Sequence, residues 1–356
     1  MNLRIKLNSY TLLVVIYLLA LVLFNSCKQK PKQESPPKSS VATQQFKTTA
    51  QEDSINLFAI IKDAIKEGDT IAFVSISDID KLPGNLNSPI DSVNRLVFPS
   101  FEGKTVEEKQ RVTLTGQFRK RLLNNAKILE NDSLYVYDYA DDKLLTFPIS
   151  SLDAVAYLNT NGDDSEYTHG ASDYQFGFKL NHIVLKKIND DYYNKTYVYI
   201  GARNPFTKGQ MHAVIWQTTN NKNMPFVALK KEETKILKGH KLTATYTFKF
   251  EDLNFFLQVY ELKKEQEPAH RLLIFNSKNE VVYNALYNET EYGGVLPISL
   301  VDNKNYKNYY EQWVGRLLKD RPTLIFGFEN NDADCDLLSY IDSSKGYIRL
   351  KCDNRF

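Results

Sequence analysis

The strongest constraint on the fold is a change of hydrophobic periodicity near Asn131, where helical spacing of apolar residues gives way to strict alternation. Many short alternating segments, separated by turn-forming residues such as Asn159–Asp164, indicate antiparallel sheet. The sheet can be a sandwich, a barrel or a propeller-like array, and no clear repeat period selects among them. The segments expected to form strands are Ser133–Tyr139, Tyr174–Leu180, Leu242–Phe250, Arg271–Phe275 and Val281–Tyr287, the last two joined as a hairpin.

The region from Ser54 to residue 130 has a mixed pattern. A first helix is expected after a cap at Asp53 or Ser54, and the segment Ile71–Ser77 reads as a buried strand. A second helix is expected to begin with the capping box Thr105-x-x-Glu108. The apolar positions that mark the first helix are Leu57, Phe58, Ile61, Ala64 and Ile65, with Gly68 past its end, and those of the second are Leu114, Phe118, Leu122 and Ala126. The chain is therefore predicted to be an α+β protein, mainly antiparallel β after residue 131, with an N-terminal helix-strand-helix region.

One stretch near the C-terminus allows two interpretations. A helical face would contain Tyr306, Tyr310, Trp313 and Leu317. Gly315 and Pro322 also allow a hairpin strand. The sequence leaves both open.

The N-terminus has the profile of an export signal. Arg4 and Lys6 precede Thr11–Phe24, an apolar run of fourteen positions. A helix needs about 20 apolar residues to cross a bilayer, so a permanent transmembrane anchor is disfavoured. The run closes with Phe24-Asn25-Ser26-Cys27, in which a small residue stands directly before a cysteine.

This ending resembles the lipobox of bacterial lipoproteins, over residues 1–27 only. The resemblance implies a signal peptide at residues 1–26 and a mature N-terminus at Cys27, anchored to a membrane by acyl chains such as palmitate. Phe24 stands where Leu is usual, a departure tolerated in lipoproteins of the Bacteroidota, whose composition this chain resembles. Lys28 is not acidic, which favours the outer membrane. The alternative is an ordinary secretory signal with an incidental cysteine.

Residues 27–53 are expected to form a disordered tether. They contain Pro31, Pro36 and Pro37 with many Ser, Thr, Gln and Lys, and too few large apolar residues to fold.

Charge argues against a nucleic-acid partner. The chain has 45 basic and 43 acidic residues, and cleavage before Cys27 would remove two basic residues and no acidic one, leaving 43 of each. The local run Arg119–Arg121 is expected to be a solvated helix face.

Two cysteines remain after lipidation, which suits a disulfide in an oxidising compartment. Leu337–Ile341 and Tyr347–Cys352 read as strands of a hairpin centred near Ser344. This pairing places Cys335 opposite Cys352, and the predicted disulfide would stabilise the fold by about 3 kcal/mol. The alternative, a two-cysteine metal site, lacks CxxC spacing and nearby histidines.

Catalytic signatures are not found in the sequence. The five histidines are dispersed, and no HExxH, GxSxG, GxGxxG or phosphate-loop motif occurs. Asp332, Asp334 and Asp336 have spacing that could hold calcium, but Leu337 and Ser343 stand where a calcium loop requires Gly and Glu. A solvated acidic turn is the favoured interpretation.

A binding surface is expected within Gly201–Trp216, which combines polar and cationic side chains with flanking aromatics. Its candidate contact residues are Arg203, Lys208, His212 and Trp216. Tyrosine pairs such as Tyr197 and Tyr199 could line a glycan or peptide groove, although cross-strand packing is their commoner role.

Three functions fit these observations. The favoured one is a lipid-anchored envelope protein, exported and non-catalytic, whose β-rich body at residues 131–356 binds an envelope component, a glycan or a partner protein. The second is an extracytoplasmic hydrolase with dispersed catalytic residues. The third is a toxin-immunity or inhibitor lipoprotein.

Overall fold

The fold is described from a computed structural model. All described residues belong to the compact unit that begins at Lys47. The described ranges are 51–66, 69–79, 103–158, 173–180, 195–262, 268–289, 293–301, 310–331, 335–342 and 346–352. The predicted signal peptide, Cys27 and nearly all of the predicted tether lie outside these ranges.

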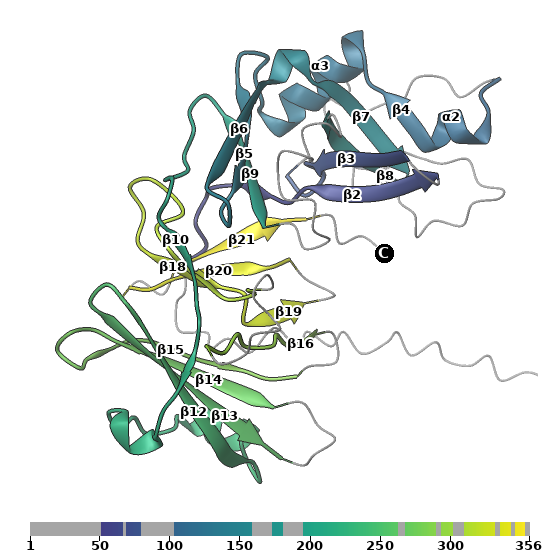
Figure 1. The fold of residues 1–356 in the computed structure, drawn as a ribbon. Coiled ribbons are helices and arrows are strands. Elements are labelled where there is room, and N and C mark those ends of the chain that lie inside the picture. Colours follow the sequence, from purple (N-terminus) through teal and green to yellow (C-terminus); the bar gives the residue numbers. More distant parts are fainter. Residues whose placement is uncertain are drawn as a thin grey trace, which may run out of the picture. The chain divides into compact units, whose positions relative to one another are not determined.

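A nine-stranded sheet forms the centre of the fold (Figure 1). Its pairings between named strands are antiparallel except β1–β21, which is parallel. In spatial order the strands are β10 (Met211–Ala213), β17 (Trp313–Gly315), β18 (Leu324–Phe326), β20 (Leu337–Tyr340), β21 (Tyr347–Lys351), β1 (Leu57–Phe58), β9 (Thr196–Gly201), β5 (Ser133–Asp138) and β6 (Lys143–Pro148).

Two five-stranded antiparallel sheets and one short ladder complete the strands. The first sheet consists of β11 (Gln217–Thr218), β12 (Lys241–Phe250), β13 (Leu253–Glu261), β14 (Ala269–Phe275) and β15 (Val281–Tyr287). The second consists of β2 (Ile61–Lys66), β3 (Asp69–Ser75), β8 (Tyr174–Leu180), β7 (Asp153–Leu158) and β4 (Arg111–Thr113), and β16 (Gly293–Val295) pairs with β19 (Glu329–Asn331).

Helices are few and short in the described ranges. The α-helices are α2 (Val106–Gln110), α3 (Gly116–Ala126) and α5 (Lys231–Ile236), and the 3-10 turns are η1 (Ile149–Ser151) and η3 (Asn221–Asn223).

Three apolar clusters hold the sheets together. One face of the nine-stranded sheet packs on itself, because Tyr137 of β5, Phe326 of β18 and Leu338 of β20 share one cluster. On the other face, Val136 joins the core of the β2–β3–β8–β7–β4 sheet and α3, and Ile325 joins the core of the β11–β15 sheet. The nine-stranded sheet is therefore curled, as in a sandwich or half-barrel, and the expectation of a β-rich α+β fold is confirmed.

The strand predictions after residue 131 are confirmed. Tyr174–Leu180 and Val281–Tyr287 match β8 and β15, and β14 pairs with β15 as the expected hairpin. In the ambiguous C-terminal stretch, residues 302–309 lie outside the described ranges, and Trp313–Gly315 forms a strand.

The predicted helix over residues 53–68 is wrong. Leu57 and Phe58 form β1, and Ile61–Lys66 forms β2. Leu57 is fully buried in one core cluster and Phe58 in another, on opposite faces of the sheet. A buried internal strand needs apolar residues on both sides, and this requirement overrides the helical spacing.

The second predicted helix is interrupted. The capping box is confirmed, since Thr105 Oγ1 accepts from the Glu108 amide at 3.2 Å and Glu108 Oε2 accepts from the Thr105 amide at 2.8 Å. Helix α2 then ends at Gln110, and β4 pairs with β7 before α3 begins. The β-branched residues Val112 and Thr113 favour this strand.

The expectation of a solvated face at Arg119 is also wrong. Its guanidinium binds Glu130 at 2.7 Å and the carbonyls of Leu152 and Ile149 at 2.7 and 2.6 Å. Arg119 therefore ties α3 to the turn before β7.

Candidate functional site

The first described residues form polar contacts with β21, the last strand of the chain, which lies inside the nine-stranded sheet. The Tyr347 amide donates to the Gln51 carbonyl at 3.2 Å, and the Asp53 amide donates to the Tyr347 carbonyl at 2.8 Å. Four residues after Asp53, β1 enters the sheet between β21 and β9. We call residues 51–58 and their partners the tether junction, since the predicted tether, residues 27–53, ends within them.

Asp53 makes the closest contacts of the junction. Its carboxylate accepts from Arg321 Nε at 2.7 Å, the Tyr340 hydroxyl at 2.8 Å and the Ile55 amide at 3.0 Å. Burial acts to raise the pKa of Asp53, but the hydrogen bonds from these three donors outweigh it, and the pKa lies below its ordinary value. Asp53 is therefore a fixed anion at neutral pH.

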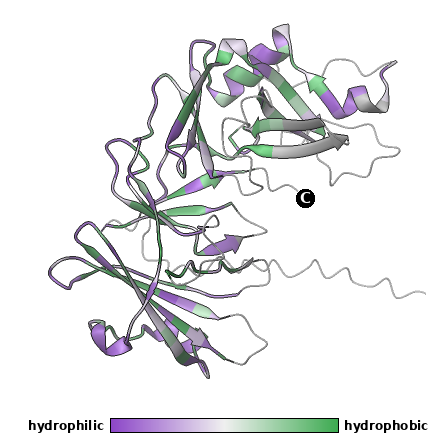
Figure 2. Cartoon of the chain, viewed as in Figure 1, coloured by the Kyte–Doolittle hydropathy of each residue, from purple (hydrophilic) through white to green (hydrophobic). Residues whose placement is uncertain are grey.

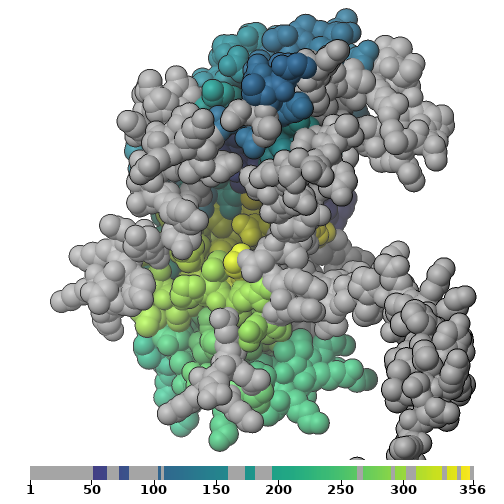
Figure 3. All heavy atoms as spheres, turned by 90° about the vertical axis from the view of Figure 1, so that its right-hand side faces the viewer, coloured from purple at the N-terminus to yellow at the C-terminus, as the bar shows by residue number. Residues whose placement is uncertain are grey.

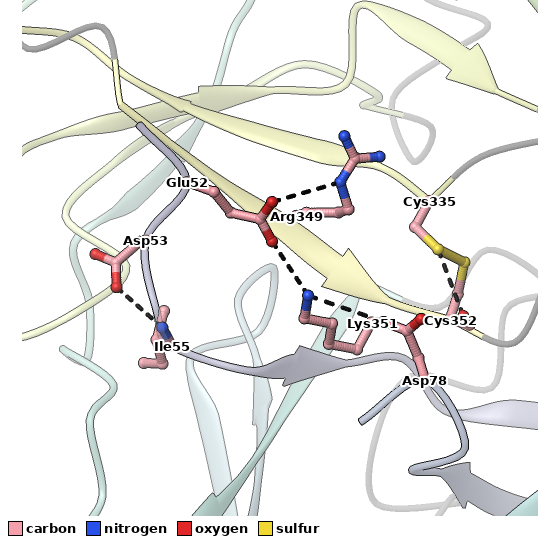
Figure 4. Close-up of polar contacts among 8 residues, drawn as sticks. All are labelled: Glu52, Asp53, Ile55, Asp78, Cys335, Arg349, Lys351 and Cys352. Atoms are coloured by element: carbon pink, nitrogen blue, oxygen red, sulfur yellow. Dashed lines mark hydrogen bonds and ion pairs between the residues drawn. A yellow bond between two sulfur atoms is a disulfide. The ribbon is translucent and has the colours of Figure 1, made fainter. Parts of the chain in front are cut away.

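Glu52 makes a second, more exposed set of ion pairs (Figure 4). Its carboxylate lies 3.1 Å from Lys351 Nζ and 3.8 Å from Arg349 Nε, and Lys351 Nζ lies 3.9 Å from Asp78. Each exposed pair contributes little, about 0–1 kcal/mol. Together with Asp53 they place acidic side chains of the entering chain against basic side chains of β21 and of the loop before β18.

A disulfide lies at the end of β21, the strand that contacts residues 51–53. Cys335 and Cys352 are bonded, with Cα atoms 5.7 Å apart, and Figure 4 shows the bridge at the end of β21. The predicted pairing of these cysteines is confirmed. Leu337 faces Arg349, so the hairpin is centred one residue earlier than expected, and Cys352 follows directly after β21.

The predicted binding segment 201–216 forms a loop that hydrogen bonds fix in place, followed by the short strand β10. The Thr207 amide donates to the Leu317 carbonyl at 2.9 Å, and the Gly209 amide donates to Asp142 Oδ1 at 2.7 Å. Gly209 has φ +65°, which favours glycine in this turn. The loop is thus tied to two other segments of the chain.

The four candidate contact residues do not share one surface. Arg203, Lys208 and His212 are exposed. Trp216 is fully buried, and its ring packs against Phe248 and Phe328 at centroid distances of 6.3 Å. Trp216 is therefore a core residue, and the accessible part of this candidate site is its three cationic or titratable side chains.

The tyrosine clusters within the described ranges fill the core. Tyr197 stacks on Tyr139 at 5.1 Å, and Tyr199 stacks on Tyr135 at 6.5 Å. Burial raises the pKa of Tyr197 well above its ordinary value. These rings serve as cross-strand pairs, the commoner of the two roles considered.

The predicted calcium ligands are only partly within the described residues. Asp332 and Asp334 lie outside the described ranges, and Asp336 is exposed, with its carbonyl accepting from the Leu350 amide at 2.9 Å. Among the described residues, no group of three or more His, Cys, Asp and Glu side chains could hold a metal ion. No helix in the described ranges is long and apolar enough to cross a membrane.

Comparison with protein-family models, curated proteins and solved structures finds no match to this chain. The junction, the disulfide and the exposed loop are the features of this chain that bear on its function. The sequence did not point to the junction, because Asp53 and Tyr340 are 287 residues apart and only the fold brings them together.

Proposed function

We propose that this protein is a lipid-anchored, non-catalytic component of a cell envelope, held to a membrane by acyl chains on Cys27. Its β-rich body binds another envelope component, a glycan or a partner protein. The observation that carries the proposal is the disulfide between Cys335 and Cys352. Structural disulfides persist in oxidising compartments outside the cytosol, where an exported lipoprotein would fold.

The junction supports the same proposal. The predicted tether covers residues 27–53, and the chain becomes part of the folded body at Gln51, where backbone hydrogen bonds to Tyr347 begin. A flexible spacer that ends in a firmly held strand lets the body stand away from a membrane while staying attached to it.

The loop at 201–212 offers a surface for a partner. Arg203, Lys208 and His212 are exposed on a loop fixed by Asp142 and Leu317. A fixed loop loses little conformational entropy on binding, and cationic side chains suit anionic or strongly polar ligands.

The anchor is tested in cells that express the full chain and are fed labelled palmitate. We expect the label to be incorporated and the protein to fractionate with membranes, and Cys27→Ala to abolish both. Lys28→Ala, which changes the next residue, is the matched control. An unlabelled wild-type product would overturn the anchor.

The binding role is tested by pull-down from solubilised envelope. We expect a partner to be recovered by the wild type and lost from the triple variant Arg203→Ala, Lys208→Ala, His212→Ala. The control removes three exposed lysines elsewhere, at Lys104, Lys120 and Lys179. Equal recovery by both triple variants would exclude this loop as the binding surface.

A further inference from the structure

A lysine-rich segment covers one face of the β11–β15 sheet. Residues 219–241, here called the strap, leave β11, pass through η3 and α5, and enter β12. In the space-filling view of Figure 3, the lower part of the described body consists of teal and green residues, the colours of the β11–β15 sheet.

The strap is fixed to the sheet by buried polar contacts. The Arg271 guanidinium donates to the carbonyls of Val227 and Ala228 at 3.1 and 3.0 Å and pairs with Glu233 at 3.1 Å. The side chains of Arg271 and Glu233 are 2% and 0% exposed. At the other end, Gln258 Nε2 donates to Asn221 Oδ1 at 2.8 Å.

Apolar packing fixes the same segment. Met224 and Val227 pack against Phe256, Leu273 and Phe275 of the sheet. The strap therefore has a definite inner side, and the orientation of its outer side is set by the same contacts.

The outer side presents one aromatic residue. Phe226, between the inward-packed Met224 and Val227, is 91% exposed, and Leu229 nearby is 38% exposed. An isolated exposed apolar residue needs no explanation, but this one stands in a fixed segment with a strong charge bias.

The charge of the outer side is almost entirely positive. Glu233 is buried against Arg271, so Glu232 is the only exposed acidic residue of the strap. Figure 2 shows α5 as predominantly hydrophilic. The exposed lysines of the strap are Lys222, Lys230, Lys231, Lys235, Lys238 and Lys241.

Helical spacing separates the two sides of α5 and the turn that follows it. Lys231, Lys235 and Lys238 recur at intervals of four and three residues and share one face. Glu233 and Leu237, which are buried, fall on the opposite face. The lysines therefore point away from the sheet.

We propose that the outer side of the strap docks on an anionic lipid bilayer, with Phe226 entering the interface and the lysines facing lipid headgroups. Charge complementarity selects this occupant, since six exposed lysines oppose one exposed acid. Aromatic residues prefer the membrane interface, and lysines near an anionic leaflet each add attraction. This docking is distinct from the acyl anchor, because it brings the folded body itself onto the membrane surface.

A tryptophan reporter at position 226 tests the proposal. The full chain carrying Phe226→Trp is purified from membranes in detergent and reconstituted into vesicles of phosphatidylcholine, with or without about 30% phosphatidylglycerol. The chain's two native tryptophans, Trp216 and Trp313, are buried, and the unsubstituted protein supplies their background signal.

We expect a blue shift and quenching by brominated lipid in the anionic vesicles, absent from the neutral ones and reversed by high salt. Adding Lys231→Gln, Lys235→Gln and Lys238→Gln should lower the docked-to-undocked ratio on the order of 100-fold. The matched control neutralises Lys104, Lys120 and Lys179 and should leave the signal unchanged.

The result that overturns the proposal is a signal that is absent or equal in both kinds of vesicle. A change that requires soluble envelope extract and not lipid would also overturn it, and would assign the strap to a protein or polysaccharide partner. The test is made independent of lipidation by a second sample that also carries Cys27→Ala and is added directly to the same vesicles. Failure of the anchor and failure of the strap are thus separate results.

Discussion

At the scale of single residues, one buried histidine has a strongly shifted pKa and a role in the pH dependence of stability. His270 lies in β14, is 5% exposed, and its Nδ1 has no hydrogen-bond partner among the described residues. Burial lowers the pKa of His270 to about 4. As the pH falls from about 6.5 to about 4, His270 takes up a proton in the unfolded chain but stays neutral in the folded protein.

Stability is therefore expected to fall as pH drops from 7 to 4.5, and His270 accounts for about 2–3 kcal/mol of that loss. His270→Leu should reduce the pH dependence by this amount in urea unfolding, even if it changes stability at pH 7. His212→Ala, at an exposed position, is the control. Equal pH dependence in His270→Leu and wild type would contradict the prediction.

A second residue-scale prediction concerns the buried ion pair under the strap. Glu233→Gln leaves the Arg271 guanidinium buried without its anion, and we expect it to cost about 3–5 kcal/mol of unfolding free energy. Glu232→Gln, at the exposed neighbouring position, should change stability by less than about 0.5 kcal/mol. Chemical denaturation of the two variants distinguishes a structural ion pair from a dispensable one.

At the scale of elements, the sequence predicts those elements whose contacts join residues close together in the chain. The hairpin β14–β15 was predictable because its strands are joined by a five-residue turn, and the capping box of α2 because its two partners are three residues apart. Strand β1 was missed because its partners, β21 and β9, lie far along the chain. The polar residues around Arg203 predict an exposed loop. The junction and the strap depend on contacts between residues far apart in the sequence, and no local pattern predicts these contacts.

The junction gives an element-scale prediction. Asp53→Ala removes the hydrogen bonds from Arg321 and Tyr340 that hold the segment against the fold, and a local one from the Ile55 amide. We expect a loss of about 1–2 kcal/mol of unfolding free energy after allowing for the partial exposure of Arg321. Hydrogen exchange should become faster in residues 53–58 and stay unchanged in β12–β15. Uniformly faster exchange would show that Asp53 acts on global stability, and Glu232→Ala serves as the exposed acidic control.

At the scale of the whole molecule, the disulfide constrains the C-terminal hairpin that receives the N-terminal segment. Cys335 and Cys352 are separated by 17 positions in sequence. Replacing both by alanine should cost about 3 kcal/mol, and a reducing agent should lower the melting temperature of the wild type but not of the double variant. A melting temperature insensitive to reductant in the wild type would count against the bridge.

If acyl chains on Cys27 anchor the protein as proposed, the position of β1 decides where proteolysis could release an intact folded body. A protease that cuts before Gln51 would shed a particle that keeps every described strand. A cut after Phe58 would instead extract an internal strand and leave β21 and β9 with unpaired edges, which invite aggregation. Release of a body that keeps all its described strands would therefore require a cut before β1.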